Sequence, residues 1–287
     1  MSKPCLPPEP VRPPIFRPPP GACDCHAHIF GPAGVYPYVE NRSFTPPDCL
    51  IADYLSVLNA LGIARGVIVH GSAHGTDNRP SMDAIATAPE RLRGVAVVDA
   101  MFEESGIDRL DRAGFRGTRM STVVRGGPGF GNLEEISARV RPFGWHLVVH
   151  VHRSAELVDL APRLLATGLP LVIDHIARVT ATEGFSAPAY KTLLQLLDTG
   201  RAWVKLSALS RTSDTGFPWS DMASLVQGVV RAHPDRVLWG TDWPHPNHFT
   251  AMPNDGDLLD AFAQWVPDAE HRQAILVSNP EKLYFSR

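Results

Sequence analysis

The chain alternates short apolar runs with longer segments in which apolar residues recur at helical spacing. The apolar runs predict strands at residues 22–29, 66–70, 94–99, 115–119, 146–151, 169–175, 202–207 and 237–240. The amphipathic segments predict helices near residues 48–61, 80–89, 104–113, 132–142, 154–167, 187–199 and 220–232, with a last pair at 256–265 and 268–277. Strands separated by helices must pair in parallel, because a helical crossover is too long for a hairpin.

Eight strand–helix units without a break in composition favour an α/β fold, a closed (β/α)8 TIM barrel in a single domain over residues 21–287. A doubly wound open sheet is the alternative, and it would usually need a G-x-G-x-x-G pattern after an early strand. The glycines at 126, 127, 129 and 131 do not follow that pattern, and we interpret them as a mobile loop. Residues 1–20 contain too many prolines for a helix or a central strand, so we expect an extended N-terminal arm that wraps the domain.

Histidines gather where the expected strands end, which is where the active site of a TIM barrel lies. His26 and His28 are two apart on a strand and should project together, with Cys25 and Ala27 turned the other way. Of the 12 histidines, six occupy such ends: His26, His28, His70, His150, His152 and His175. One carboxylate, Asp242, follows the last strand. Whether His150 or His152 points inward depends on a one-residue register that the pattern leaves open.

Several cationic and hydroxyl side chains occupy the same strand ends. They are Ser72, Arg119, Arg125, Arg178, Lys205 and Arg211. Arginine binds carboxylates bidentately and stays charged at any working pH, so this set favours a pocket for a di- or tricarboxylate. The alternative for each arginine is a surface position paired with a nearby acid. Lys205 lies inside an apolar strand and is either a substrate ligand or a buried structural cation.

The composition argues against some classes of binding partner. A net charge of −3 and a pI near 6.4 argue against nucleic acid or an anionic membrane as the main partner. No run of 18 apolar residues is present, and prolines interrupt the N-terminus where a signal peptide would be apolar. Cys23 and Cys25 form C-x-C rather than C-x-x-C, so we expect reduced cysteines in a soluble, cytoplasmic protein. The oligomeric state stays open, a homo-oligomer included.

At family level the chain resembles the amidohydrolase superfamily, most of all the branch of 2-pyrone-4,6-dicarboxylate lactonase and related lactone-processing enzymes. The resemblance rests on His26-x-His28, on His175, on Gly240-Thr241-Asp242-Trp243-Pro244-His245 and on the Asn279-Pro280 and Leu283-Tyr284-Phe285 ending. It implies that Asp242 is the general base. It also implies that His26, His28 and His175 polarise the scissile carbonyl, or ligate a metal in relatives that use one.

The same resemblance implies that Arg119, Arg125 and Arg211 grip substrate carboxylates, with Ser72 in the matching loop. Two features depart from it: Phe44 stands where we expect a tyrosine hydroxyl, and His150 and His152 are additional. The expected substrate is a small anionic lactone of the kind met in aromatic-compound breakdown.

Two mechanisms fit these residues. In one, His26, His28, His175 and Asp242 hold a single zinc ion that lowers the pKa of bound water to about 7. In the other, which we favour, no metal or other cofactor takes part. Asp242 then deprotonates water while the histidines stabilise the oxyanion, since a pyrone lactone is an activated ester. The absence of a lysine at the end of the fourth strand argues against a two-metal site.

Three other functions remain alternatives. A sugar-acid lactone isomerase also occurs in this branch, but the retained H-x-H pair and Asp242 favour net hydrolysis. A metal-dependent decarboxylase would tend to carry a glutamate at the first H-x-H position. A catalytically inactive barrel used as a binding module predicts the loss of His26, His28, His175 or Asp242, and all four are present.

Overall fold

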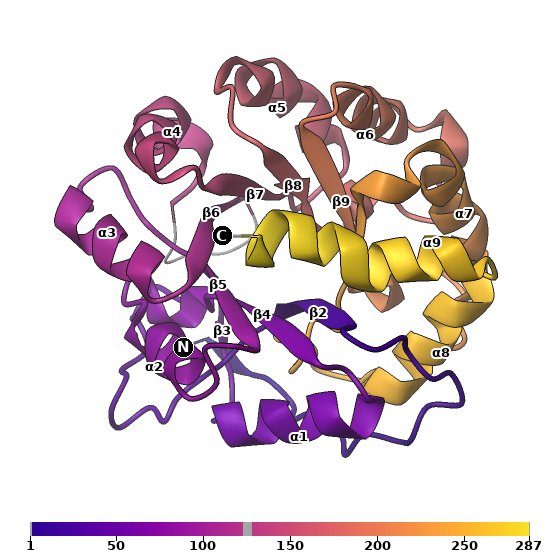
Figure 1. Ribbon diagram of the computed structural model, residues 1–287, viewed down its shortest axis with the longest axis horizontal. Helices are drawn as coiled ribbons and strands as arrows, with labels where there is room; N and C mark the ends of the chain where they lie inside the picture. The colour runs from indigo at the N-terminus through magenta and orange to yellow at the C-terminus, as the bar shows by residue number, and fades with distance from the viewer. Residues whose placement is uncertain (1, 123–127, 287) are drawn as a thin grey trace.

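Eight parallel strands form one sheet that nearly closes on itself, in a computed structural model that describes residues 2–122 and 128–286 (Figure 1). The strands follow the order β10-β9-β8-β7-β6-β5-β4-β2. They are β2 (Cys23–Ala27), β4 (Arg65–Val69), β5 (Leu92–Ala96), β6 (Phe115–Ser121), β7 (His146–His150), β8 (Leu171–Ile173), β9 (Ala202–Leu206) and β10 (Val237–Trp239). Each overlaps a predicted strand, and the (β/α)8 TIM barrel is confirmed.

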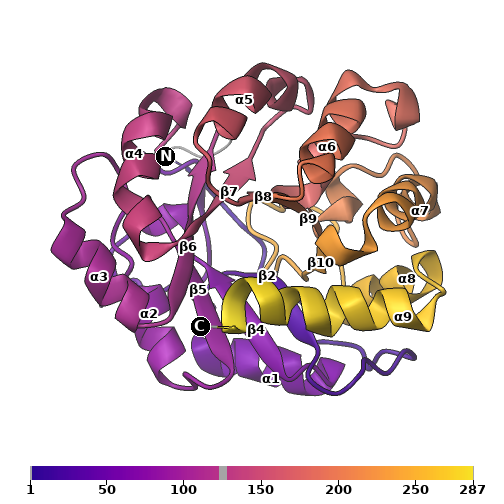
Figure 2. The same ribbon diagram turned by 45° about the horizontal axis from the view of Figure 1, so that its top comes forward.

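Helices surround the sheet on its outer side (Figures 1 and 2). They are α1 (Ile51–Leu61), α2 (Arg79–Ala86), α3 (Glu104–Arg112), α4 (Leu133–Val140), α5 (Ala155–Ala166), α6 (Pro188–Asp198), α7 (Ala223–Ala232), α8 (Asp255–Trp265) and α9 (Ala269–Gln273). After α9 the chain continues in π-type turns at Ala274–Ser278 and Glu281–Phe285, and this C-terminal helix lies across the barrel. None of the helices in the described ranges has both the length and the apolar character needed to span a membrane.

The strands are apolar on both faces, as a sheet covered by helices requires. In β4, Ile68 packs in the layer between the sheet and the helices, while Val67 and Val69 belong to a second cluster inside the barrel. That interior cluster also contains Cys23, Cys25, Val95, Val148, Val172, Trp203, Leu238 and, from the C-terminal helix, Tyr284. The barrel is therefore a packed core from which the strand ends rise toward the site.

The alternation of faces breaks in β2. The register of β2 against β4 shifts between Asp24 and Ala27. Cys25 lies in the interior cluster, yet the next side chain, His26, also points inward and lies 3.3 Å from the buried Lys205. The prediction that Cys25 and His26 face opposite ways is therefore wrong, because a bulge places consecutive residues on one face. The prediction that His26 and His28 project together holds, with ring centroids 5.0 Å apart.

The barrel closes through Asp24. Between β2 and the chain after β10 there is only a single parallel bridge, Ala27 with Trp243, among the described residues. The buried carboxylate of Asp24 strengthens this junction by accepting hydrogen bonds from the His26 and Thr241 backbone N–H groups at 3.0 Å each. It also accepts from the Thr241 hydroxyl at 2.7 Å and from the Tyr54 hydroxyl of α1 at 3.1 Å. Burial raises the pKa of Asp24 to about 6, although all four donors favour its anion.

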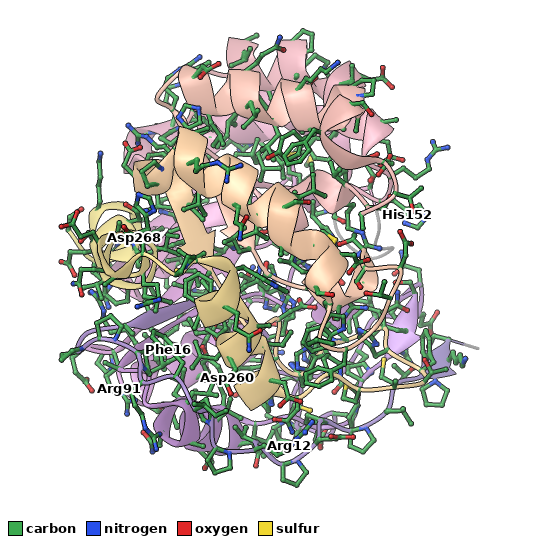
Figure 3. The ribbon with its side chains drawn as sticks, turned by 90° about the vertical axis from the view of Figure 1, so that its right-hand side faces the viewer. Arg12, Phe16, Arg91, His152, Asp260 and Asp268 are labelled. Atoms are coloured by element: carbon green, nitrogen blue, oxygen red, sulfur yellow. The ribbon has the colours of Figure 1, made fainter. Side chains whose placement is uncertain are left out.

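The N-terminal segment lies against the barrel as an extended chain. Its strand β1 (Lys3–Pro4) pairs in parallel with β3 (Phe44–Thr45). Further on, the backbone N–H of Phe16 donates to Asp260 of α8 at 2.8 Å, and Arg12 forms an ion pair with Asp257. Figure 3 shows Arg12, Phe16 and Asp260 on the same side of the molecule. Because its prolines lack N–H groups, the segment is held by a few such donors rather than by a ladder.

We predict that Asp24→Ala destabilises the fold by about 3 kcal/mol or more, because two backbone N–H groups lose their acceptor in a buried place. Tyr54→Phe removes one of the four donors and should cost about 1 kcal/mol. Asp24→Asn should fall between them, since an amide oxygen can still accept from both backbone groups. Denaturant unfolding measures all three. Equal stability of Asp24→Ala and Tyr54→Phe would contradict the assigned role of Asp24.

Candidate active site

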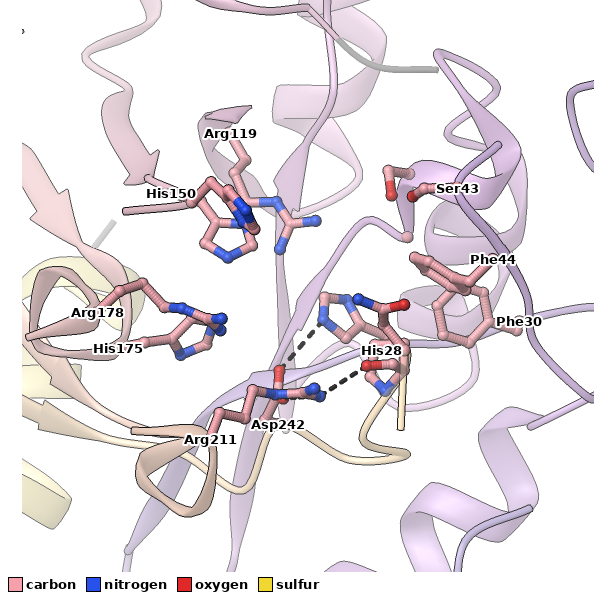
Figure 4. A pocket seen from close by; sticks show the side chains of 15 residues that line it. His28, Phe30, Ser43, Phe44, Arg119, His150, His175, Arg178, Arg211 and Asp242 are labelled. Atoms are coloured by element: carbon pink, nitrogen blue, oxygen red, sulfur yellow. Dashed lines mark hydrogen bonds and ion pairs between the residues drawn. The ribbon is translucent and has the colours of Figure 1, made fainter. Parts of the chain in front are cut away.

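A cavity of about 160 Å³ opens at the carboxyl ends of the strands (Figure 4). Nine of the predicted residues line it: His28, Ser72, Arg119, His150, His152, His175, Arg178, Arg211 and Asp242. Phe30, Ser43, Phe44, Gly71, Pro246 and Asn247 complete the lining. Both His150 and His152 reach the cavity. Arg125, like Gly126 and Gly127, lies outside the described residues.

Asp242 is the only carboxylate among the described lining residues. Its Oδ1 lies 3.6 Å from Nε2 of both His26 and His28, and its Oδ2 accepts a hydrogen bond of 3.0 Å from Arg211 Nη2. Burial alone would raise the pKa of Asp242, but the charge of the neighbouring Arg211 holds that pKa well below its usual range. The group is therefore an anion whose Oδ1 faces the imidazoles.

The imidazoles at the base of the cavity are neutral. Burial lowers the pKa of His26 and of His150 well below the ordinary value, and it lowers the pKa of His28 as well. Burial likewise lowers the pKa of His175 to about 4. A neutral imidazole has one donor and one acceptor nitrogen, so each ring can either donate to a developing oxyanion or offer a lone pair.

Hydrogen-bond partners decide which nitrogen does which. His28 Nδ1 lies 2.7 Å from the carbonyl oxygen of Val69, which can only accept. The proton of neutral His28 is therefore on Nδ1, and Nε2 presents a lone pair to the site. His175 Nδ1 lies 2.8 Å from the Ser207 hydroxyl, which can donate or accept, so His175 Nε2 remains free to donate when Ser207 donates.

A buried ion pair lies beneath His26. Lys205 of β9 and Asp174, directly after β8, are both fully buried, with Nζ and Oδ1 3.2 Å apart. The same lysine lies 3.3 Å from His26 Nδ1. Of the two readings of Lys205, the structure supports a buried cation, since it does not line the cavity. The position of Lys205 within an apolar strand was visible in the sequence, but its pairing with Asp174 was not.

The three arginines that line the cavity differ in their partners. Arg119 is buried and Arg178 is half-buried, and neither forms an ion pair within residues 2–122 and 128–286. Arg211 donates to Asp242 and, at 2.6 Å, to the carbonyl oxygen of Pro246. We expected all three arginines to bind substrate carboxylates. In Arg211, however, one nitrogen already donates to the carboxylate of Asp242.

His70 lies outside the cavity lining, whereas Phe44 belongs to it. His70 is fully buried behind the cavity, with Nδ1 2.9 Å from the Ser81 hydroxyl, and burial lowers its pKa to about 3. Phe44 lines the cavity and packs on Phe30, with ring centroids 6.0 Å apart. Phe44 thus gives an apolar wall where a tyrosine would offer a hydroxyl.

The described residues offer a set of donors that fits one metal ion. Ligand atoms of His26, His28 and Asp242 all lie within 4.8 Å of one another, and two nitrogens with one oxygen suit zinc. His175 does not join this group: it forms a second one with His26 and Asp174. The four-ligand set expected from the sequence is thus divided between two overlapping groups.

Comparison with known proteins agrees with this geometry. The family model described as Amidohydrolase matches residues 23–285, which is nearly the whole barrel. The chain belongs to the amidohydrolase family. Within it, the chain is 36% identical to 4-sulfomuconolactone hydrolase of Rhizobium radiobacter, over 98% of this chain and 96% of that one. It is 37% identical to 2-pyrone-4,6-dicarboxylate hydrolase of Comamonas testosteroni, over 95% and 92%.

Two further proteins that are similar to this chain have related names. D-galactarolactone isomerase of Agrobacterium fabrum is 30% identical over 93% of this chain and 91% of that one. A solved structure from Acinetobacter baumannii, a probable 2-pyrone-4,6-dicarboxylic acid hydrolase with citric acid bound, superposes with a TM-score of 0.80. That pair is 28% identical and covers 92% of this chain and 99% of the other. The solved structure shares the barrel, and each of these relatives is named as a hydrolase or a lactone isomerase.

We predict that Arg211→Met raises the pKa of both Asp242 and His175, because the guanidinium lowers both. Arg211→Lys keeps the charge and is the matched control. The titration of His175, followed by NMR of histidine-labelled protein, should move to higher pH in Arg211→Met and move less in Arg211→Lys. An unchanged His175 titration in Arg211→Met would contradict the electrostatic role given to Arg211.

Proposed function

We propose that this amidohydrolase hydrolyses a small lactone that carries two or three anionic groups. One observation carries the proposal: three guanidinium groups and a single carboxylate line the described cavity, and the buried imidazoles of His28, His150 and His175 are neutral. Such a pocket has an excess of positive charge, which a polyanionic ligand would balance. The two hydrolases named above act, by name, on lactones with anionic substituents, which supports the same substrate class.

Arg119 and Arg178 are the proposed anchors for the anionic groups, because neither has an acidic partner among the described residues. Arg211 has donors beyond those used by Asp242 and Pro246, since a guanidinium has five N–H groups. Ser72 offers a hydroxyl at the opposite wall, and Arg125 belongs to the proposed set on the strength of the resemblance alone. Phe30 and Phe44 would contact the ring face.

In the proposed reaction, a water oxygen bonds to the lactone carbonyl carbon and the ring carbon–oxygen bond breaks. Asp242 Oδ1 accepts the proton of the water, and this proton passes to the leaving ring oxygen. His175 donates to the carbonyl oxygen as it gains negative charge. The hydrogen bond to Val69 leaves His28 Nε2 without a proton, so His28 does not donate to the carbonyl oxygen.

A mononuclear zinc hydrolase is the alternative within the same site. His26, His28 and Asp242 would hold the ion, which would lower the pKa of bound water and polarise the carbonyl. We favour the metal-free route, because an activated ester needs only general-base and hydrogen-bond assistance.

Lactone isomerisation is the second candidate, and the 30% identical D-galactarolactone isomerase favours keeping it. Isomerisation opens the ring and closes it on a different hydroxyl, whereas hydrolysis ends with the open acid. Product analysis of a lactone panel that varies in carboxylate number therefore separates the two.

Asp242→Asn should lower kcat/KM on a dicarboxylate lactone by about 10³-fold, within the range for loss of a general base. Folding should be retained, because the amide keeps the size of the side chain. Asp159→Asn, on the exposed face of α5, is the control and should be near wild type. Near-normal turnover by Asp242→Asn would exclude Asp242 as the base.

Arg119→Met should raise KM for a dicarboxylate lactone by about 10–100-fold, the worth of one charged hydrogen bond, and leave KM for a neutral lactone unchanged. Arg109→Met, on the exposed side of α3, controls for the loss of a positive charge elsewhere. Steady-state kinetics on paired substrates measure the difference. An equal change for charged and neutral lactones would remove Arg119 from the anion site.

A further inference from the structure

Lys205 is a fully buried cation that the proposed mechanism does not use. Its ammonium lies 3.2 Å from Asp174 Oδ1 and 3.3 Å from His26 Nδ1, behind the face of His26 that looks toward the cavity. Isolated charges are costly to bury, and Asp174 balances this one. Burial alone would raise the pKa of Asp174, but the charge of Lys205 holds it well below its usual range, so the pair consists of a cation and an anion.

The two ends of a hydrogen-bonded chain fix its direction. An ammonium group can only donate, so His26 Nδ1 must be the acceptor in its contact with Lys205. The Val69 carbonyl can only accept, so His28 Nδ1 must be the donor there. Between them, His26 Nε2 lies 3.3 Å from His28 Nε2. One assignment satisfies these three contacts: Lys205 donates to His26, His26 to His28, and His28 to Val69.

The opposite arrangement of His26 is the one that a metal ion would need. If His26 Nδ1 carried the proton, it could donate to Asp174 Oδ1, which lies 3.4 Å away. The Nε2 lone pairs of His26 and His28 would then face each other at 3.3 Å, an arrangement that only a cation between them stabilises. Metal-ligating histidines commonly donate their other nitrogen to a carboxylate in this way.

We propose that Lys205 is a positioning residue that holds His26 with its proton on Nε2 and thereby disfavours a divalent cation at His26, His28 and Asp242. Its ammonium acts in two ways. It occupies His26 Nδ1 as a donor, and it adds positive charge behind a site that would receive a second cation. Its effect on catalysis rests on the proposed function, whereas its effect on metal binding does not.

Zinc binding by the chelator-treated full chain tests the proposal. Lys205→Met removes both the donor and the charge, while Lys205→Gln keeps an N–H donor and removes the charge. Isothermal titration with zinc chloride should show Lys205→Met binding about 10–100-fold more tightly than wild type, the range for changes behind a metal-ligating histidine. If zinc affinity rises in Lys205→Met alone, the effect comes from the lost hydrogen-bond donor. If zinc affinity rises in both variants, the effect comes from the lost charge. Unchanged zinc affinity in both would overturn the proposal.

Removing Lys205 leaves Asp174 buried without its cation, which can itself impair folding. The double variant Lys205→Met with Asp174→Asn removes the pair together, and it should also bind zinc more tightly than wild type. A further measurement uses the wild-type protein alone. Nitrogen NMR of labelled histidines should show His26 protonated on Nε2 and His28 protonated on Nδ1. A His26 ring protonated on Nδ1 in metal-free wild type would overturn the proposal.

Kinetics give the last readout. Because Lys205 does not line the cavity, Lys205→Met without metal should lower kcat on an accepted lactone and leave KM nearly unchanged. A change in KM alone would contradict the positioning role. If no lactone is turned over, the proposed function fails while the zinc and NMR results still decide the role of Lys205.

Discussion

The carboxylate of Asp24 joins the first strand of the barrel to the loop after the last one, and the geometry of the site depends on this junction. The Asp24 carboxylate accepts a hydrogen bond from the N–H of His26, and the carbonyl oxygen of His26 accepts one from the Asp242 N–H at 2.8 Å. The next link runs from the His28 N–H to the Trp243 carbonyl oxygen at 2.7 Å. The imidazoles and the proposed base are therefore fixed to one another through backbone bonds, by a carboxylate that does not itself line the cavity.

Burial then sets the protonation of these groups. It lowers the pKa values of the histidines, whereas the charge of Arg211 keeps the pKa of Asp242 low. The result is a site with one anion and neutral rings, surrounded by guanidinium groups. Neutral rings matter because an imidazolium next to Asp242 would donate a hydrogen bond to the carboxylate. It would then compete with the water that Asp242 is proposed to deprotonate. The same burial makes the unpaired charge of Arg119 costly, which favours a bound anion.

The periodicity of apolar residues was enough to predict all eight strands, because in a parallel barrel each strand is buried on both faces and stands out from the amphipathic helices. The rule that sites lie at strand ends then predicted most of the cavity lining. It could not predict the bulge at Cys25 and His26, since one extra residue leaves the composition of a strand unchanged. Nor could it predict that Arg211 contacts Asp242, or Lys205 contacts Asp174, because such pairs depend on how neighbouring strands are aligned.

A low pKa makes Asp242 a constant anion but also a weak base, and the structure contains a way to reconcile the two. Arg211 engages only Oδ2, so Oδ1 stays open toward His26 and His28. Arg211 lines the cavity, and its guanidinium has N–H groups beyond those used by Asp242 and Pro246. A substrate carboxylate bound to those groups would share the charge of Arg211 and weaken its hold on Asp242. The basicity of Asp242 would then rise when an anionic substrate is in place, which couples recognition of the anion to activation of the water.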